Sequence, residues 1–485
     1  MSSDVDKASD PASGARGARG EMARFLGAGS LYTIATVAPI LTLLAVTPVV
    51  SRILGAGAFG EVAVAVSIYQ FSSVILGLGL PAAITRNALI EGGGFRAAGG
   101  LVLAGSGLAV VLAALAAVSA PLWSPAAFPA IPVDAVQYAL AAGAGLAIVT
   151  LAQGVFRAAE RVWTFVAIGG AAAIVPPLAG VIVLLTWNAS PSAYLAALAA
   201  AYLLVGLVSV VVVMRHERPG LSAGELRSGL AIAVPTVPHL VSVPLILTIS
   251  LSIVLQNEGV AQAGRLQLAA MLGTAAVTVL NAMNNAWSPM ILKAPSIERE
   301  SVLARSTHVV ALAAFVLVSG YGIIAPYAVA LVGGPVADDS LPAQASMMIT
   351  AGSLFLVLYL ANIHLTFLSG RTLPLALTTP LSLVIAVLVL WALVTFLPAD
   401  GSLVVYGIAW PLFYVFQALF AYLLARGSGY PPARVRRALL PLGLGVLVCV
   451  QGSILPGQPL TTMAVVAVFA AILLVLLLRQ RRRSA

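Results

Sequence analysis

The segment 51–70, SRILGAGAFGEVAVAVSIYQ, contains Gly55-x-Gly57-x-x-Gly60, which is the spacing of a dinucleotide-binding fingerprint. In that fingerprint the glycines form a tight turn that lets a pyrophosphate approach a helix N-terminus. A nucleotide site also needs a βαβ unit and an acidic residue about 20 positions further on. Residues 75–85 read ILGLGLPAAIT and supply neither. We therefore expect these glycines to form a turn between two helices instead.

Amide side chains within apolar segments are a second group that could bind a ligand. Asn281, Asn284 and Asn285 are spaced i, i+3 and i+4, which places them on one face of a helix. Three amides are costly against lipid, so they should face protein or water. Two interpretations stay open, a substrate-binding face and a hydrogen-bond cluster that locks the helix. The polar candidates for substrate binding are Gln70, Gln267, Asn281, Asn284, Asn285, His239 and His364.

The two histidines stand alone in the sequence. For each of them, packing through a hydrogen bond is the commoner role, and proton coupling or sugar binding is the sharper hypothesis. They are too isolated to form a metal site, so we expect no metal. No Walker A loop is present, and no cofactor is expected.

The composition decides what kind of protein carries these side chains. Of 485 residues, 61% are hydrophobic and only 8% are charged, whereas soluble proteins carry about 25% charged residues. Windows of bilayer-spanning length number about fourteen. They cover residues 27–50, 62–85, 98–120, 134–155, 163–186, 193–214, 229–255, 262–290, 306–330, 343–368, 373–397, 402–425, 438–456 and 460–478. The prediction is an all-α polytopic membrane protein.

The basic residues predict the topology. If the N-terminus is inside, every Lys and Arg except Arg52 and Arg265 falls in an inside segment. This asymmetry follows the positive-inside rule and places both termini in the cytoplasm. The net charge of +9 is thus a topology signal, and no nucleic acid partner is expected. The two exceptions lie near the outer ends of spans, where they either snorkel to the headgroups or bind a ligand.

A weak internal repeat organises the chain. GAGAFGEVAVA at 55–65 resembles EGVAQAGRLQLAA at 258–270, so that Gly60 aligns with Gly264 and Pro39 falls close to Pro244. Two six-span repeats with a substrate site between them are a common transporter plan. We expect a disordered cytoplasmic tail (1–26), an N-lobe (27–214), a cytoplasmic linker (215–228), a C-lobe (229–425), two C-terminal spans (438–478) and a basic cytoplasmic tail (479–485).

The first hairpin carries a family resemblance. SRILGAGAFGEVAVAVSIYQFSSVILGLGLPAAITR resembles the first hairpin of the polysaccharide and O-antigen flippases, within the multidrug/oligosaccharidyl-lipid/polysaccharide exporter superfamily. The matching residues are Arg52, Leu54, Gly55, Phe59, Gly60, Gly77, Leu78 and Gly79. QGVFRAAERVWTF at 153–165 resembles the family's link between spans 4 and 5. The family usually has an acidic residue late in span 7, where this chain has Ser250 or Ser252, so any role of that acid is absent or reassigned.

The resemblance implies a non-enzymatic flippase in the bacterial cell membrane. It would move polyprenyl-diphosphate-linked oligosaccharides from the inner to the outer leaflet for O-antigen, capsule or exopolysaccharide assembly, with two lobes in a V that alternate access. Glycosyltransferases and a polysaccharide polymerase would be its partners, and it would act as a monomer. Arg52 and Arg265 would bind the diphosphate near the outer mouth. The residues that would capture it at the inner mouth are Arg24, Arg86 and Arg305.

Three alternative functions are less well supported by the sequence. A multidrug or cation antiporter should carry an acidic residue inside one lobe, and no Asp or Glu lies in the middle of any proposed span. A peptidoglycan-precursor flippase usually has an Arg-Asp pair in span 1, which is absent here. A polysaccharide polymerase or ligase needs a substantial outer loop, and the longest outer loops are about 121–133 and 331–342.

Overall fold

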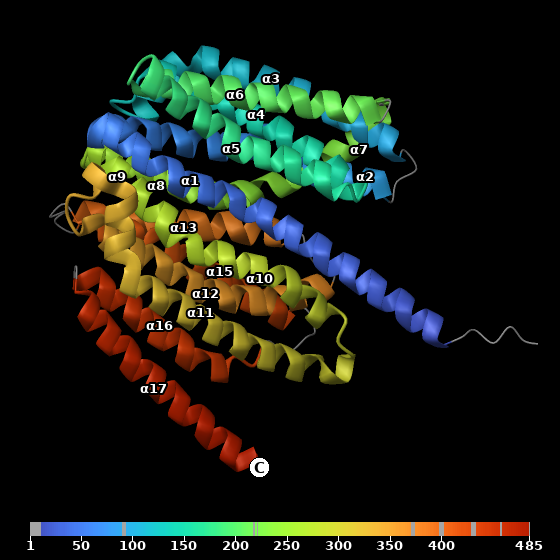
Figure 1. Cartoon of the computed structure of the whole chain (residues 1–485), viewed down its shortest axis with the longest axis vertical. Coiled ribbons are helices and arrows are strands. Elements are labelled where there is room, and N and C mark those ends of the chain that lie inside the picture. The colour runs from blue at the N-terminus through green and yellow to red at the C-terminus, as the bar shows by residue number, and fades with distance from the viewer. Residues whose placement is uncertain are drawn as a thin grey trace, which may run out of the picture.

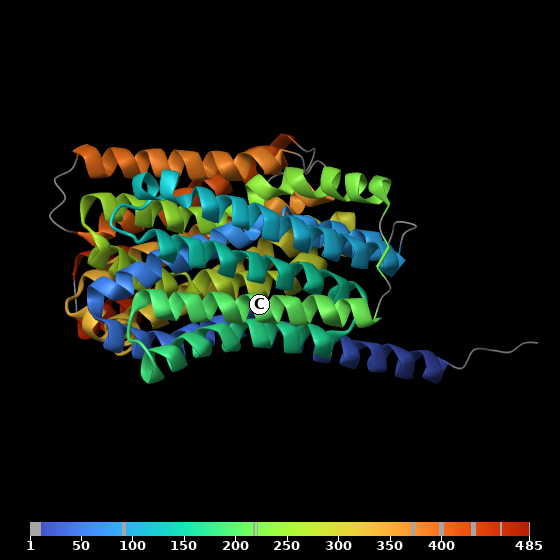
Figure 2. The same cartoon turned by 90° about the horizontal axis from the view of Figure 1, so that it is seen from above.

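The chain folds as a bundle of long helices, shown in two orthogonal views in Figures 1 and 2. The computed structural model describes residues 11–89, 94–216, 219–220, 222–369, 374–396, 402–427, 433–455 and 458–484. Within these ranges side chains are described for Pro39 and from Leu41 onward, except at 286, 375, 477 and 479–484. Within these ranges the regular structure is entirely helical. The first elements are α1 (Pro11–Leu76), α2 (Leu80–Leu89), α3 (Gly94–Ala127), α4 (Val133–Ala158), α5 (Val162–Thr186), α6 (Pro191–His216) and α7 (Ala223–Ala233).

The second part of the chain repeats this pattern with more breaks. Its elements are η1 (Val234–Thr236), α8 (Val237–Asn257), α9 (Val260–Gly273), α10 (Ala275–Leu292), α11 (Ser296–Gly333), η2 (Gly334–Ala337), α12 (Leu341–Leu368), α13 (Leu375–Phe396), α14 (Leu403–Gly407), α15 (Ala409–Gly427), α16 (Arg436–Ile454) and α17 (Pro459–Ser484). The predicted span 229–255 is thus broken at η1, where Pro235 removes a backbone donor. The predicted span 262–290 is divided between α9 and α10.

The number of spans agrees with the prediction. Thirteen helical segments among the described residues are long and apolar enough to cross a membrane. One of them, Leu41–Leu76, contains Gly55, whose φ of 73° and ψ of 177° are not helical. The chain turns back there, so the two arms of α1 run antiparallel and account for two spans (Figure 1). The all-α, polytopic prediction is confirmed.

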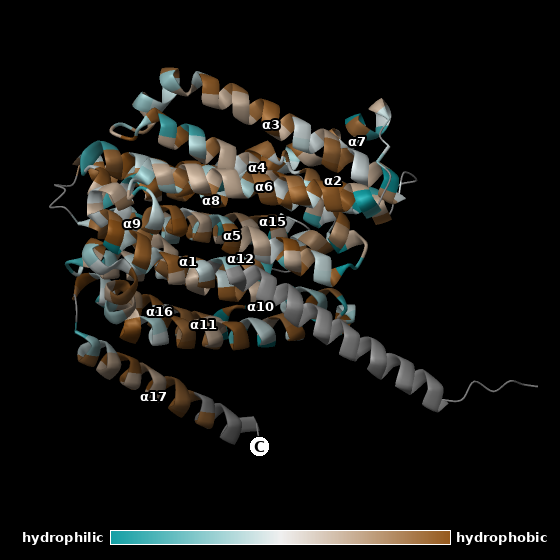
Figure 3. Cartoon of the chain, turned by 45° about the horizontal axis from the view of Figure 1, so that its top comes forward, coloured by the Kyte–Doolittle hydropathy of each residue, from teal (hydrophilic) through white to brown (hydrophobic). Residues whose placement is uncertain are grey.

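The surface of the bundle suits a hydrocarbon solvent. Val118 and Leu122 on α3 are 81% and 87% exposed, and many other large apolar side chains are exposed along the helices. Figure 3 shows hydrophobic colour along the helices and hydrophilic colour gathered at the ends of the bundle. Apolar surface of this extent marks membrane contact in a chain with so few charges. The protein is a multi-pass membrane protein.

The helices form two groups. In the first, α4 packs against α3 and α6, and α5 packs against α6; in the second, α12 packs against α9, α11, α15 and α16. Helix α1 packs with the first group through α4 and α5 and also against α8, α9 and α11 of the second. Helix α7, which precedes α8, packs against α2 of the first group. Helix α17 lies at the edge, against α11 and α16 (Figure 1).

The bundle has two distinct ends. The C-terminal ends of α2, α4, α6 and α10, with Arg86, Arg157, Arg215 and Lys293, lie together on the right of Figure 1, and we call this the basic end. The turn at Gly55 and the start of α9 lie at the opposite, left-hand end, which we call the bend end.

The N-terminal tail differs from the prediction. Residues 11–26 were expected to be disordered, but α1 begins at Pro11 and runs through them. The segment EMARFL directly precedes the apolar span, and its residues are mostly good helix formers, so an existing helix extends through them at little cost. Residues 1–10 lie outside the described part of the chain. At the other end, α17 continues into the predicted basic tail as far as Ser484.

The two bends share one backbone conformation. Gly259, which caps α9, has φ 88° and ψ −179°, close to the values of Gly55. The two glycines occupy equivalent positions when Gly60 is aligned with Gly264. Backbone geometry thus supports the weak repeat found in the sequence. Only glycine readily adopts this region of φ/ψ space.

Replacing Gly55 or Gly259 with alanine should therefore destabilise the fold. Each substitution strains the backbone by about 1–3 kcal/mol, which thermal unfolding in detergent would report as a lower midpoint. Gly57→Ala is the matched control, because Gly57 has no positive φ and a Cβ there meets nothing within 4 Å. Equal midpoints for Gly55→Ala and Gly57→Ala would show that the bend does not require glycine.

Candidate functional site

A cavity of about 450 Å³ lies between the two groups of helices. Residues of α1, α5, α6, α8, α9, α10 and α15 line it. Three of the predicted site residues converge on it from both groups, namely Gln70 of α1, Gln267 of α9 and Asn281 of α10. Pro39 and Pro244, which fall close to each other when the two halves are aligned, line it as well. The cavity thus sits at the repeat interface, where transporters place their substrates.

The cavity wall contains an aromatic cluster that the sequence interpretation missed. Trp410, Phe413 and Tyr414 of α15 line one part of it, and Tyr69 and Tyr202 of the first group line another. The rings of Tyr69 and Tyr202 lie 5.4 Å apart. The spacing of the α15 residues, i, i+3 and i+4, is the signal that drew attention to the asparagines. In the sequence these residues fall within the apolar window 402–425, and they were not among the predicted site residues.

The polar groups of the wall are uncharged. Hydroxyl groups of Thr274 and Thr278 join the three amides. None of the described residues that line this cavity is Asp, Glu, Lys, Arg or His. Gln267 is only 7% exposed, and its Oε1 atom has no hydrogen-bond partner among the described residues. Such a wall can bind a polar, uncharged group.

The two halves meet backbone to backbone at the bend end. A Cβ atom built on Gly264 would lie 3.0 Å from Cα of Gly60, and one built on Gly60 would overlap the carbonyl oxygen of Val260. Phe59 is buried beside this contact. Helices approach this closely only where glycine omits the side chain. We call this contact between Gly60, Val260 and Gly264 the glycine seal.

Hydrogen bonds between the halves accompany the glycine seal. The Ser252 hydroxyl of α8 donates to the Ala127 carbonyl of α3 at 2.5 Å. The Thr248 hydroxyl donates to the Ser67 carbonyl of α1 at 3.3 Å. Ser252 is one of the two serines that stand where the family usually has an acid. In this chain its hydroxyl joins the halves.

Arg52 also joins the halves. Its Nη1 atom donates to the Pro48 carbonyl at 2.8 Å, and Nη2 donates to the Leu331 carbonyl near the end of α11 at 3.2 Å. The cation therefore interacts with a carbonyl at the negative end of a helix. Arg52 does not line the cavity.

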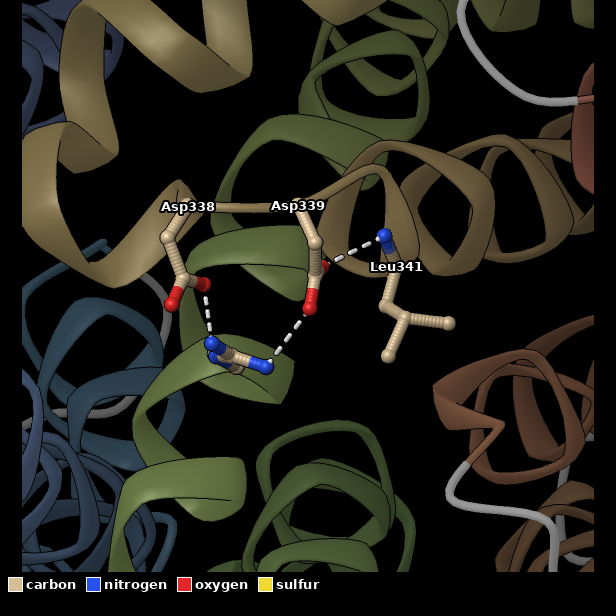
Figure 4. A network of polar contacts seen from close by, with 4 residues as sticks. Asp338, Asp339 and Leu341 are labelled. Carbon is tan, nitrogen blue, oxygen red and sulfur yellow. Dashed lines mark hydrogen bonds and ion pairs between the residues drawn. The ribbon is translucent and has the colours of Figure 1, made fainter.

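Arg265 is held by two carboxylates (Figure 4). Its Nη1 atom lies 2.9 Å from Oδ2 of Asp339, and its Nη2 atom pairs with Oδ1 of Asp338. The Arg265 side chain is 12% exposed. Asp339 also accepts a hydrogen bond from the Leu341 amide at 2.8 Å, so the group fixes the chain between η2 and α12. Arg265 does not line the cavity either.

The three asparagines of α10 do not share one environment. Asn281 lines the cavity, whereas Oδ1 of Asn284 is hydrogen-bonded to Nε2 of His364 on α12 at 2.9 Å. The Trp287 ring lies edge-on to the His364 ring, with centroids 5.0 Å apart. Asn285 is exposed and does not line the cavity. For Asn284 the geometry favours the interhelical cluster, and for Asn281 it favours the ligand-binding face.

His239, Arg86 and Arg305 do not line the cavity. Nδ1 of His239 is hydrogen-bonded to Oγ1 of Thr379 at 2.8 Å, which links α8 to α13. Arg86 lies in the last turn of α2 and Arg305 lies in α11. Arg24 falls in the part of α1 where only the backbone is described.

Sequence comparison assigns the family. The family model described as "Polysaccharide biosynthesis protein" matches residues 26–294, more than half of the chain. The chain therefore belongs to the polysaccharide biosynthesis protein family, and the resemblance seen in its first hairpin is confirmed. No curated protein matches the sequence significantly.

Solved structures identify the fold. The chain resembles the lipid II flippase MurJ in an inward closed conformation, with a TM-score of 0.65 and 12% identity over 93% of this chain and 99% of that one. It resembles an inward-facing multidrug resistance MATE family transporter of the MOP superfamily (TM-score 0.51, 15% identity, 82% and 94% covered). A MOP superfamily transporter from Pyrococcus furiosus is similar too (TM-score 0.53, 15% identity, 82% and 95% covered). At these identities the likeness establishes the fold.

Proposed function

We propose that this protein is a flippase in the bacterial inner membrane. It moves a polyprenyl-diphosphate-linked oligosaccharide from the inner to the outer leaflet, for the assembly of cell-surface polysaccharide. The observation that carries the proposal is the uncharged, amide- and aromatic-lined cavity at the interface of the two halves. Membership of the polysaccharide biosynthesis family supports a glycan as cargo.

The orientation of the protein is part of the proposal. The basic end faces the cytoplasm, in accordance with the positive-inside rule, and the glycine seal faces outward. In this arrangement the cavity is closed on the outer side and receives the glycan from the inside. Separation of Gly60 from Gly264, with closure at the basic end, then exposes the glycan to the other side.

The predicted residues take different roles in this mechanism. Gln70, Gln267 and Asn281 bind the glycan. Arg52 stabilises the closed outer side, and Arg265 supports the chain between η2 and α12. Asn284, His239 and His364 hold helices together. The residues that receive the lipid headgroup at the inner mouth are Arg24, Arg86 and Arg305.

The partners follow from the substrate. Glycosyltransferases on the cytoplasmic face supply the lipid-linked glycan, and a polysaccharide polymerase uses it on the other side. One chain supplies both halves of the cavity, so the protein acts as a monomer. Cation export is a weaker second hypothesis, because no described cavity-lining residue is a carboxylate.

The test is transbilayer movement of a fluorescent polyprenyl-diphosphate oligosaccharide in proteoliposomes. The intact protein should move the lipid, and Asn281→Leu should slow it about tenfold through one lost ligand hydrogen bond. Asn285→Leu is the matched control, since this neighbouring amide is exposed and does not line the cavity. If the intact protein moves no lipid-linked glycan, the flippase proposal is wrong.

A further inference from the structure

We propose that the cavity selects uncharged sugars of the lipid-linked glycan and leaves the diphosphate outside. This inference rests on the proposed flippase function and names the part of the substrate that the cavity recognises. Three features of the wall carry it, namely the absence of charged side chains, the unpartnered Oε1 atom of Gln267 and the aromatic residues.

The first feature is the absence of a counter-ion. None of the described lining residues carries a charge. A phosphate or carboxylate placed here would lose water without gaining a cation, which is strongly unfavourable. Arg265, the cationic residue of α9, is paired with Asp338 and Asp339. Arg52 is hydrogen-bonded to backbone carbonyls at the bend end. A neutral ligand meets no such penalty.

The second feature is an amide oxygen without a hydrogen-bond partner. Gln267 is more than nine-tenths buried, lines the cavity, and leaves its Oε1 atom without a hydrogen bond. A buried acceptor of this kind is costly unless a ligand donates to it. A sugar hydroxyl or an N-acetyl N–H can donate, whereas an ionised phosphate offers only acceptors. Gln70 and Asn281 add two more amides, each with a donor and an acceptor to match hydroxyl groups.

The third feature is the aromatic part of the wall. Trp410, Phe413 and Tyr414 lie on one helix of the second group, and Tyr69 and Tyr202 lie in the first. The face of an aromatic ring is negative, so the polarised C–H face of a sugar ring packs well against it. The amides can bind the hydroxyl groups at the edge of a pyranose ring, and the aromatic rings can pack against its C–H face. Together these groups match a pyranose.

The size of the cavity limits what it holds. Its volume of about 450 Å³ falls within the range of about 300–1,000 Å³ that is usual for small-molecule sites. It therefore accommodates a short portion of the glycan. The diphosphate remains on the lipid side, towards the basic end and its arginines.

The test compares three fluorescent lipids with the same short polyprenyl chain. One carries a neutral oligosaccharide, one carries the same oligosaccharide with a uronic acid replacing one hexose, and one is the bare diphosphate. The intact protein should move the neutral glycan at least about tenfold faster than the uronic acid analogue, because the carboxylate finds no cation. It should also move the neutral glycan faster than the bare diphosphate.

Variants locate the selectivity in the cavity. Gln267→Leu and Trp410→Leu should each slow the neutral lipid about tenfold, and Trp410→Phe should recover part of the rate. Trp391→Leu is the control, because Trp391 is 56% exposed on α13 and does not line the cavity. The comparison of the three lipids uses the intact protein, so it does not depend on how any variant folds.

The outcomes separate this inference from the function on which it rests. If the uronic acid analogue or the bare diphosphate moves as fast as the neutral glycan, the inference is wrong while the flippase proposal stands. If none of the three lipids moves, the flippase proposal itself fails. An equal loss of rate in Trp410→Leu and Trp391→Leu would also contradict recognition by the cavity wall.

Discussion

Under the proposed mechanism, Gly60→Ala should lower transport at least about tenfold, because the overpacked bend end costs more than about 1.4 kcal/mol to close. The added Cβ atom would overlap the carbonyl oxygen of Val260 and lie 2.9 Å from its Cγ1 atom. The side chain of Val260 can rotate, but its carbonyl oxygen belongs to the first turn of α9 and cannot move alone. The halves must therefore separate, and the conformation described here loses population.

Labelling of a cysteine in the cavity measures this shift directly. Cys449 is the single native cysteine and is fully buried, so a cysteine placed at Leu43, which lines the cavity, serves as the reporter. A membrane-impermeant maleimide added from outside should label it slowly in the parent protein and faster when Gly60→Ala is present.

Gly57→Ala is the control for this experiment. It adds the same methyl group one helical turn away, where nothing lies within 4 Å. It should change neither labelling nor transport. If Gly60→Ala labels and transports like Gly57→Ala, the glycine seal does not close the cavity.

The sequence was enough to predict the spans, the repeat and part of the cavity. Long apolar windows and the distribution of Lys and Arg are local properties of the sequence. They can therefore be identified without knowing which residues contact one another in the fold. Gly60 could be matched with Gly264 because similar segments surround them in the two halves, whereas the equivalence of Gly55 and Gly259 became visible in their backbone angles. Gln70, Gln267 and Asn281 stood out because amides are expensive against lipid.

Residue partners distant in the chain could not be predicted. Asn281 and Asn284 belong to the same helical pattern, and only the position of His364 on α12 gives them different roles. Arg265 broke the charge pattern, but its carboxylate partners Asp338 and Asp339 lie on a segment whose folding back onto α9 depends on tertiary structure. Helical periodicity alone does not decide which of several neighbours a side chain meets.

The second large effect is a loss of stability, which we expect when Gly145 is replaced at the point where α4 crosses α6. A Cβ atom there would lie 2.5 Å from the carbonyl carbon of Tyr202 and 2.7 Å from the amide nitrogen of Leu203. Gly206 of α6 also lies close to α4, since a Cβ atom built on it would be 3.0 Å from the Gly145 carbonyl oxygen. Small residues at such crossings let membrane helices pack through their backbones.

Gly145→Ala should therefore lower the free energy of unfolding by about 1–3 kcal/mol, because backbone atoms cannot rotate away from the added methyl group. Thermal unfolding in detergent would show it as a lower midpoint. Gly107→Ala on α3 is the control: its Cβ meets nothing within 4 Å, and alanine favours a helix over glycine by about 1 kcal/mol. Its midpoint should stay the same or rise, and a Gly145→Ala midpoint as high as that of Gly107→Ala would contradict a tight crossing.

Transport by the folded fraction of Gly145→Ala adds a second measurement. The clash falls on the backbone of Tyr202, whose side chain lines the cavity opposite the second group of helices. If α6 moves away from α4, this ring moves with it, so transport per folded molecule should fall together with stability. A lower midpoint with unchanged transport would mean that the position of Tyr202 does not matter for the cargo, and the aromatic contribution would then rest on Tyr69 and the residues of α15.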